Sequence, residues 1–309
     1  MFRNTKKYIT SLIIILIIAG SYITRELKHA NLTNDSQITT ELTHDSVQQT
    51  PPTGTSELLD IWVNQTQNLY NHQTLNNNNK EYYMSVDPSI TVDSNTTNDI
   101  ITDKGWTVYQ GIDSNGRTGA VTALITYDVV NYVASLDRPD FSSNTIVPGQ
   151  YTKAQLIEPT NTYTWKKTNN SKSNNFKTNM TINNVSYNGY AFNKSHLIAW
   201  SLGGDMLDHN LIWGTRAQNV GSNYSKDPGG MSYIETLVRN YIHDTHNAKI
   251  LYTAVPIYKT KNDIVPIAVY VEAIDTMNPE GFSHAAWTLN QQDGLIIDYT
   301  TGHAEIAKY

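Results

Sequence analysis

The chain has 309 residues, with 22 Lys and Arg against 28 Asp and Glu, which gives a formal charge of -6. It contains no cysteine, which excludes a disulfide scaffold, a thiolate zinc site and a cysteine nucleophile. The acidic balance argues against capture of nucleic acid by the charge of the whole chain, so such binding would need a local basic patch.

An apolar segment near the N-terminus predicts export. The basic cluster in residues 3–7 precedes the apolar residues 8–23, and this order keeps the N-terminus in the cytoplasm and places the rest outside. The segment lacks the polar stripe of a buried core helix. Two interpretations stay open for residues 1–24: a signal peptide cleaved near Ala19-Gly20-Ser21, or an uncleaved signal anchor. We expect the protein at the extracellular face of the cell membrane, or secreted if the segment is cleaved.

Residues 25–80 are expected to form a polar extracellular linker. They are rich in Asn, Thr, Gln and Ser, and such a stretch buries too little apolar surface to offset the ordering of the chain. One apolar island within residues 58–70 is compatible with a short helix. Apolar runs alternate with turn signals from about Glu81 onward, so residues 81–309 are predicted to be the folded domain.

The domain is predicted to be α+β, with a central antiparallel sheet and flanking helices. Helices are expected over residues 215–224, with Thr215 as the N-cap, and over residues 231–242, where apolar residues recur at helical spacing. Asn188-Gly189 is expected to be a tight turn. Strands are expected at residues 106–109, 120–127, 185–187, 190–192, 249–258, 265–274 and 295–299.

His196 is the candidate general base. It follows a strand and precedes an apolar stretch, and such packing can present a neutral ring nitrogen to a water molecule. The interval to Asn219 (219 − 196 = 23 residues) suffices for a loop, a strand from Asn210 and one helical turn. A strand–strand–helix finger would therefore bring Asn219 beside His196. The side-chain oxygen of Asn219 is a neutral hard ligand, which suits Mg²⁺ that keeps most of its waters.

These residues resemble the DNA/RNA non-specific endonucleases, a family of ββα-metal (His-metal finger) nucleases, close to membrane-anchored DNA-entry nucleases and secreted DNases of Gram-positive bacteria. The similarity places His196 at the general base, Asn210 at the start of the second strand and Asn219 at the metal, with 219 − 210 = 9. It also covers residues 116–119 and 297–302, besides the residues around the finger.

The resemblance implies a ββα-metal finger, Mg²⁺ as cofactor with Mn²⁺ as a substitute, and cleavage of DNA and RNA to 5′-phosphate products. It implies that Arg216 joins His196 and Asn210 in the catalytic set, and that Glu235 or Asp227 supports the metal, with Glu235 preferred.

The family's Asp-Arg-Gly-His motif reads Asn193-Lys194-Ser195-His196 here, so a carboxylate and a guanidinium are missing. Lys194 can still meet a phosphate as a point charge, and Arg117 is a weaker candidate for substrate binding.

A second class of protein fits the same residues: a catalytically decayed surface DNA-binding or adhesion protein on this fold. The altered histidine motif and the negative charge favour it, whereas retention of both His196 and Asn219 favours the enzyme. The expected partners are DNA, RNA and the cell membrane. A basic patch for nucleic acid, or else a solvated loop, is expected at Lys153, Lys166, Lys167, Lys172 and Lys177.

Overall fold

The computed structural model describes residues 82–88, 104–142, 145–150, 174–182, 185–222 and 228–307. The predicted export segment, linker and apolar island lie outside these residues. Within the described ranges, no helix has the length and hydropathy that a membrane span requires. Also outside are Lys153, Lys166, Lys167, Lys172 and Asp227.

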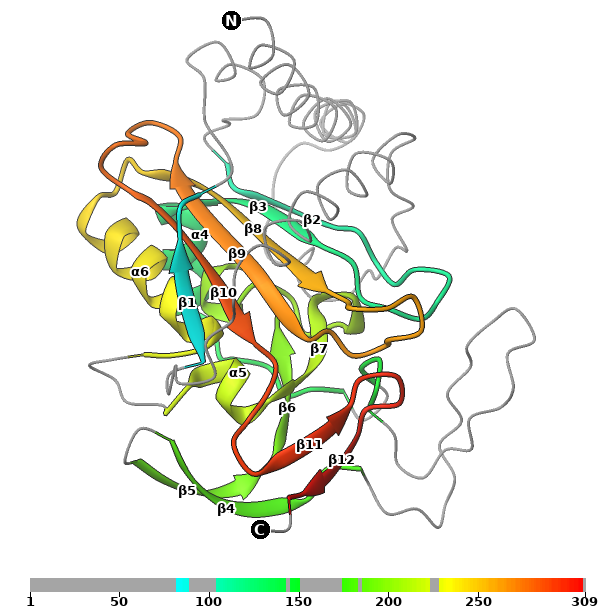
Figure 1. Cartoon of the computed structure of the whole chain (residues 1–309). Coiled ribbons are helices and arrows are strands. Elements are labelled where there is room, and N and C mark those ends of the chain that lie inside the picture. The colour runs from blue at the N-terminus through cyan, green and yellow to red at the C-terminus, as the bar shows by residue number, and fades with distance from the viewer. Residues whose placement is uncertain are drawn as a thin grey trace, which may run out of the picture.

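A six-stranded antiparallel sheet forms the centre of the domain (Figure 1). Its strand order is β1-β10-β9-β8-β3-β2, so consecutive strands β8, β9 and β10 form a meander. This sheet and its few helices confirm the predicted α+β class. The strands are β1 (Tyr83–Val86), β2 (Trp106–Tyr109), β3 (Val121–Thr126), β8 (Lys249–Ile257), β9 (Ala268–Asp275) and β10 (Ser283–Leu289).

Both faces of the sheet are buried, which explains why β8 and β9 are continuous apolar runs rather than alternating ones. One face is covered by α6 (Met231–Asp244), whose apolar side chains recur at helical spacing as predicted. The opposite face carries an aromatic pair, Tyr270 and Trp287, with ring centroids 5.3 Å apart. The α6 side chains that reach the core are Met231, Ile234, Val238 and Ile242.

The predicted strand–strand–helix finger is present. It consists of β6 (Phe192–His196), β7 (Leu211–Thr215) and α5 (Arg216–Val220), and β6 pairs antiparallel with β7. Thr215 caps α5 as expected, because its hydroxyl accepts the backbone N–H of Gln218 at 3.0 Å. The helix ends earlier than predicted, since Gly221 takes a φ of 53° after Val220.

Two sequence-based expectations were wrong. The strand expected to continue to Tyr127 ends at Thr126, whose hydroxyl caps α4 (Tyr127–Ala134) instead. Asn188-Gly189 lies within a strand rather than at a turn: β5 (Val185–Tyr190) runs through it and pairs with β4 (Lys177–Ile182). The remaining elements are η1 (Trp200–Leu202), η2 (Asp208–Asn210), β11 (Leu295–Asp298) and β12 (His303–Ile306).

Candidate active site

His196 ends β6 and lies opposite Leu211, the first residue of β7. Its ring is 7% exposed and stands 5.5 Å from the ring of Phe141, and its Nε2 lies 3.2 Å from Met206 Sδ. Burial, and to a smaller extent the positive charge of Arg138, together lower the pKa of His196 to about 4, against the opposing effect of Asp205. The imidazole is therefore neutral at physiological pH, which is the form that a general base requires.

Asn219 is brought to the same end of the finger by α5. Its Oδ1 accepts a hydrogen bond of 3.1 Å from Ser195 Oγ, and Ser195 is the neighbour of His196 on β6. The amide is partly exposed, so its oxygen can also meet a ligand from solvent. The residue next to His196 thus contacts Asn219 directly, across an interval of 24 residues (219 − 195 = 24).

Asn210 has no exposed surface, and its amide braces the loop that follows His196. Its Nδ2 donates to the carbonyl oxygens of Ile198 and Asp205 at 3.0 and 2.8 Å, and its Oδ1 accepts the Ile198 N–H at 3.1 Å. The Asn210 backbone carbonyl also accepts the N–H of Leu197 at 2.8 Å. With its amide engaged in this way, the residue is suited to positioning His196.

Glu235 comes from α6 and approaches the finger from the side of the sheet. Its surface is only partly covered, yet desolvation raises the pKa of its carboxyl group to about 7, while Arg239 and Arg138 oppose that shift. Near Glu235, the Tyr252 hydroxyl donates a hydrogen bond to the Leu197 carbonyl at 2.9 Å. The pKa of Tyr252 is raised by burial and then by the charge of Glu235. The carboxylate therefore lies in the electrostatic neighbourhood of the residue that follows His196.

Gly230 sets the approach of α6 to α5. It precedes α6 with a φ of 56°, a left-handed conformation that glycine adopts without strain. A Cβ at this position would overlap the backbone carbonyl oxygens of Gln218 and Ala217 in α5. The helices that carry Asn219 and Glu235 therefore meet backbone to backbone.

Two arginines at this site were not singled out in the sequence. Arg138, an exposed residue in the loop after α4, acts electrostatically on both His196 and Glu235. Arg239 follows Glu235 by one helical turn and donates to Ser201 Oγ at 3.4 Å. The i, i+4 spacing of Glu235 and Arg239 was a detectable signal for the second. For Arg138 no local pattern exists, since only the fold brings that loop to the finger.

Lys194 lies two residues before His196 on β6, and it extends toward the same aromatic ring. Its Nζ donates to the Thr145 carbonyl at 2.6 Å and stands 5.1 Å over the Phe141 ring. Burial lowers the pKa of this lysine. Lys194 and His196 thus share Phe141 as a neighbour, which places one cation beside the candidate base.

The other two cations predicted from the sequence are held by neighbours. The Arg216 guanidinium lies 4.9 Å over the Tyr187 ring, and burial lowers its pKa. The Arg117 guanidinium forms an ion pair of 2.6 Å with Asp113 and stands 5.1 Å over Tyr258. Arg216 begins the helix that carries Asn219, whereas Arg117 belongs to the β2–β3 connection and is neutralised there.

The candidate metal ligands predicted from the sequence are the amide oxygen of Asn219 and the carboxylate of Glu235. In the described part of the chain, no three His, Asp or Glu side chains gather as a metal cluster. Two hard oxygen donors suit a cation that retains several waters, as Mg²⁺ does, better than one that needs a closed protein cage. His243 is 82% exposed at its side chain and His246 stacks on Tyr127, so neither joins this set.

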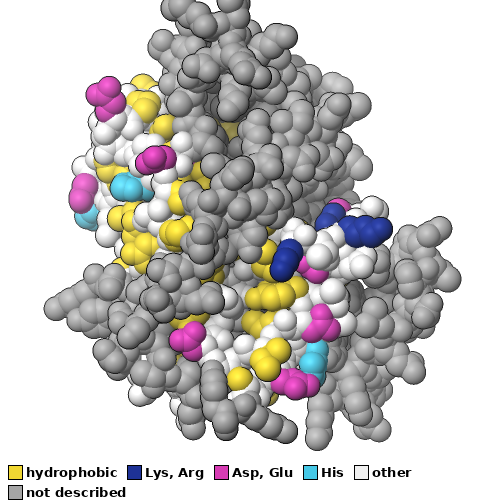
Figure 2. Space-filling model, in the orientation of Figure 1, with side chains coloured by type: hydrophobic (Ala, Val, Ile, Leu, Met, Phe, Trp, Pro, Cys, Tyr) yellow, Lys and Arg dark blue, Asp and Glu magenta, His cyan; other side chains and the backbone are white. Residues whose placement is uncertain are grey.

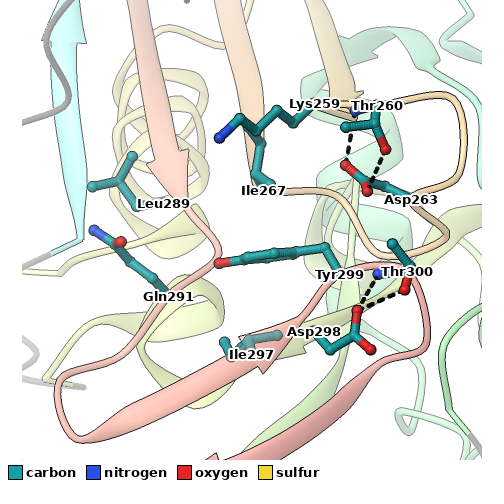
Figure 3. Close-up of a pocket in the computed structure, with 10 residues that line it drawn as sticks. All are labelled: Lys259, Thr260, Asp263, Ile267, Leu289, Gln291, Ile297, Asp298, Tyr299 and Thr300. Carbon is teal, nitrogen blue, oxygen red and sulfur yellow. Dashed lines mark hydrogen bonds between the residues drawn. The ribbon is translucent and has the colours of Figure 1, made fainter.

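A separate surface cavity of about 390 Å³ lies between the β8–β9 connection and β11 (Figure 3). Tyr299 stands in its middle and Lys259 extends over it, while the carboxylates of Asp263 and Asp298 are bonded to threonines. No residue of the finger lines this cavity. Figure 2 shows a small group of Lys and Arg side chains over the β2–β3 and β8–β9 connections, on the same face.

Comparisons with known proteins identify the family of the chain. Residues 88–307 match the family of DNA/RNA non-specific endonucleases. A deoxyribonuclease of Streptococcus dysgalactiae subsp. equisimilis is 34% identical over 113 residues, which are 37% of this chain and 32% of that protein. The match thus spans about a third of the length of this curated relative.

Two solved structures extend the comparison. Sda1 nuclease, solved with a bound zinc ion, is 27% identical with a TM-score of 0.59, over 74% of this chain and 98% of that one. NucA from Streptococcus agalactiae, solved with a bound magnesium ion, is 20% identical with a TM-score of 0.47, over 72% and 83% of the two chains. The finger and α6 lie within the residues that match the family.

Proposed function

The chain belongs to the DNA/RNA non-specific endonuclease family, and from that premise we propose that it hydrolyses phosphodiester bonds of DNA, and of RNA, without sequence preference. The observation that carries the proposal is the contact between Ser195 and Asn219 at 3.1 Å, beside a buried neutral His196. It joins a base and a metal ligand in one small finger.

In this proposal His196 accepts a proton from the attacking water. The water oxygen forms a bond to phosphorus while the bond to the leaving 3′-oxygen breaks, so the product carries a 5′-phosphate. Asn210 keeps the loop after His196 in place through its three amide hydrogen bonds, and Met206 and Phe141 enclose the ring. Asn210 is then a positioning residue.

Asn219 and Glu235 would hold the metal ion, for which we propose Mg²⁺, with Mn²⁺ as a substitute. When bound, such an ion supplies neutralisation of the charge that develops on the phosphate and on the leaving oxygen. The hard oxygen donors support this choice, and a nuclease relative that binds an ion, Sda1 with zinc, supports a metal at the fold. Because Sda1 was solved with zinc, cleavage with Zn²⁺ should be compared directly with cleavage with Mg²⁺ and Mn²⁺.

Phosphate binding is proposed for cations around the finger. Lys194 and Arg216 flank the base and the metal ligand, and Arg138 and Arg239 approach from the loop after α4 and from α6. Contacts to the phosphate backbone position a nucleic acid and carry no sequence information. This arrangement supports cleavage without a recognition helix. Arg117 would bind substrate only after leaving Asp113.

The deciding assay uses the full-length chain, kept in mild detergent because of residues 8–23. We expect it to degrade plasmid DNA and single-stranded RNA with Mg²⁺ or Mn²⁺, to be inactive with EDTA, and to cleave far more slowly as the His196→Ala variant. DNA binding without cleavage, whatever the ion, would instead support the decayed surface-binding protein.

We propose that the protein stays at the extracellular face of the membrane through residues 1–24, with residues 25–80 as a linker and residues 81–309 as the nuclease domain. The apolar segment behind a basic cluster and the long polar stretch after it support this arrangement. Recovery of the mature protein in the medium, with an N-terminus at or just after Ser21, would contradict it.

A further inference from the structure

The β4–β5 hairpin is joined directly to the active-site finger. Only Ala191 separates β5 from β6, and its backbone carbonyl accepts the N–H of Arg216, at the start of α5, at 2.8 Å. The Asn175 side chain bonds to both backbone groups of Phe192, at 2.8 and 3.0 Å. In Figure 1 the hairpin continues the finger outward at its lower end. These bonds hold the base of the hairpin against the first strand of the finger.

Each side of the hairpin carries an aromatic ring paired with a cation. Tyr187 faces α5 and has the Arg216 guanidinium 4.9 Å from its ring. Its own ring lies against Gly189, where a Cβ would collide with it. Tyr190 lies on the other side, is 51% exposed, and has Lys177 Nζ 5.6 Å from its ring. Tyr187 thus holds an arginine of the finger, whereas the pair formed by Tyr190 and Lys177 is open to solvent.

The charge of this region selects an anionic ligand. The sequence contains no Asp or Glu from residue 177 to residue 192, although acidic residues outnumber basic ones in the whole chain. An exposed aromatic face beside an ammonium group is the combination with which proteins hold unpaired nucleotides, because the ring stacks on a base while the cation meets the backbone. A paired base inside a duplex has no free face to offer.

The geometry also fits a strand that leaves the active site. Tyr190 precedes His196 by six residues, and the chain bends at Ala191, so the two residues are separated by at most roughly 20 Å. Arg216 precedes Asn219 by three residues of helix, or about 4.5 Å along the axis. At the spacing of about 3.4 Å per nucleotide, a strand with its scissile phosphate at the finger would reach Tyr190 within about six nucleotides.

We propose that the β4–β5 hairpin is a binding arm for an unpaired strand of nucleic acid, with Tyr190 stacking on a base and Lys177 contacting the adjacent phosphate. The proposal rests on the proposed nuclease function and adds a substrate preference to it. The arm favours single-stranded DNA, RNA and frayed duplex ends over closed duplex, and Tyr187 links it to the finger through Arg216.

Binding is measured with the full-length His196→Ala variant, which separates affinity from cleavage. The probes are a fluorescein-labelled single strand of about ten nucleotides, long enough to span the two sites, and the blunt duplex of the same sequence. Tyr190→Ser should weaken single-strand binding about ten-fold, whereas Tyr190→Phe, which keeps the ring, should bind as the parent does. Duplex affinity should stay unchanged in both variants.

The charge is tested separately through salt dependence. Lys177→Ser should reduce the slope of log affinity against log salt by about 0.7, the contribution of one single-strand phosphate. Lys261→Ser removes the same charge from the β8–β9 connection and should leave the slope unchanged, as should Ser186→Ala on the hairpin itself.

Two results would overturn the proposal of a binding arm. One is equal single-strand affinity of Tyr190→Ser and Tyr190→Phe, and the other is a loss of duplex affinity in Tyr190→Ser as large as its loss of single-strand affinity. These outcomes are distinct from failure of the proposed function. A parent chain that cleaves nucleic acid with no effect of the arm variants refutes the arm alone. A parent that cleaves nothing, while Tyr190→Ser still loses single-strand affinity, refutes the nuclease and leaves the arm.

Discussion

Ser195 Oγ donates a hydrogen bond to Asn219 Oδ1 at 3.1 Å, so the residue before the candidate base holds the amide of the candidate metal ligand. We expect Asn219→Ala to raise the Mg²⁺ concentration needed for half-maximal cleavage, with part of the rate recovered at high Mg²⁺. Ser195→Ala should shift the requirement in the same direction by less, because the amide loses its orientation and keeps its oxygen. Cleavage rates titrated against Mg²⁺ measure both, with Ser186→Ala as the control. An unchanged Mg²⁺ requirement in Asn219→Ala would remove Asn219 from the metal site.

Removal of the candidate base should affect catalysis and leave binding intact. His196→Ala is expected to lower the cleavage rate by about 10² to 10⁴, while affinity for DNA and for Mg²⁺ is retained. Added imidazole can enter the vacated space and should restore part of the rate. His243→Ala, an exposed histidine on α6, is the matched control and should behave as the parent. Near-parent cleavage by His196→Ala would refute the assignment of the finger as the active site.

The pH dependence of cleavage should follow the buried imidazole. An ordinary histidine, with a pKa near 6.5, would lose activity below about pH 6, but the pKa of His196 is lowered to about 4. The proposed metal ligand Glu235 has a carboxyl pKa raised to about 7 and could impose an acid limb of its own, so the rates are measured at saturating Mg²⁺, which keeps that carboxylate ionised. Because the neutral ring is the active form, the rate should then persist down to about pH 5 and fall at lower pH. Arg138→Gln removes a charge that lowers this pKa, so its acid limb should move to higher pH. An acid limb near pH 6.5 that persists in the parent at saturating Mg²⁺ would contradict the lowered pKa of the base.

The same lowered pKa makes folding stability depend on pH. Below about pH 6.5 the unfolded chain takes up a proton at this histidine, whereas folded His196 stays neutral until the pH approaches its pKa of about 4. This contribution to stability is therefore complete above pH 6.5 and is lost as the pH falls toward 4. Urea unfolding of the parent and of His196→Leu, compared across this range, isolates the contribution, because the variant lacks the titrating ring.

We expect the main effect of replacing Asn210 to be on folding stability, with loss of cleavage as a consequence. Asn210→Ala leaves the Ile198 N–H and two carbonyl oxygens without their buried partner, which should cost about 3 kcal/mol of unfolding free energy. Asn188→Ala, at an exposed position of β5, is the control and should cost almost nothing. If Asn210→Ala kept full stability and still lost cleavage, Asn210 would act on the substrate rather than on the loop.

The sequence predicted the finger because its parts are local. A capping threonine at Thr215, an apolar strand before it and a histidine at the end of another strand each leave a pattern in neighbouring residues. The helical spacing of the apolar residues in α6 could also be recognised in the sequence. These local signals placed His196 and Asn219 on the correct elements, and the fold then brought them together.

The remaining features were missed for two reasons: in two of them a neighbouring residue overrides the expected pattern, and in one the partners lie far apart in the sequence. Tyr127–Ala134 has the β-branched, aromatic composition of a strand, but the Thr126 cap turns it into a helix. Asn188-Gly189 lies in a strand because Gly189 makes room for the Tyr187 ring. The position of Arg138 relative to His196 and Glu235 is a property of the packed domain alone.

Gly230 controls how closely α5 and α6 approach each other at the candidate site. At Gly230 the main chain before α6, which carries Glu235, lies against the main chain of α5, which carries Asn219, so no side-chain rearrangement can absorb an added group there. A single methyl at residue 230 would act as a wedge and push the two helices apart. With the proposed ligands on these two helices, such a change would alter metal affinity from a residue that touches neither the ion nor the nucleic acid.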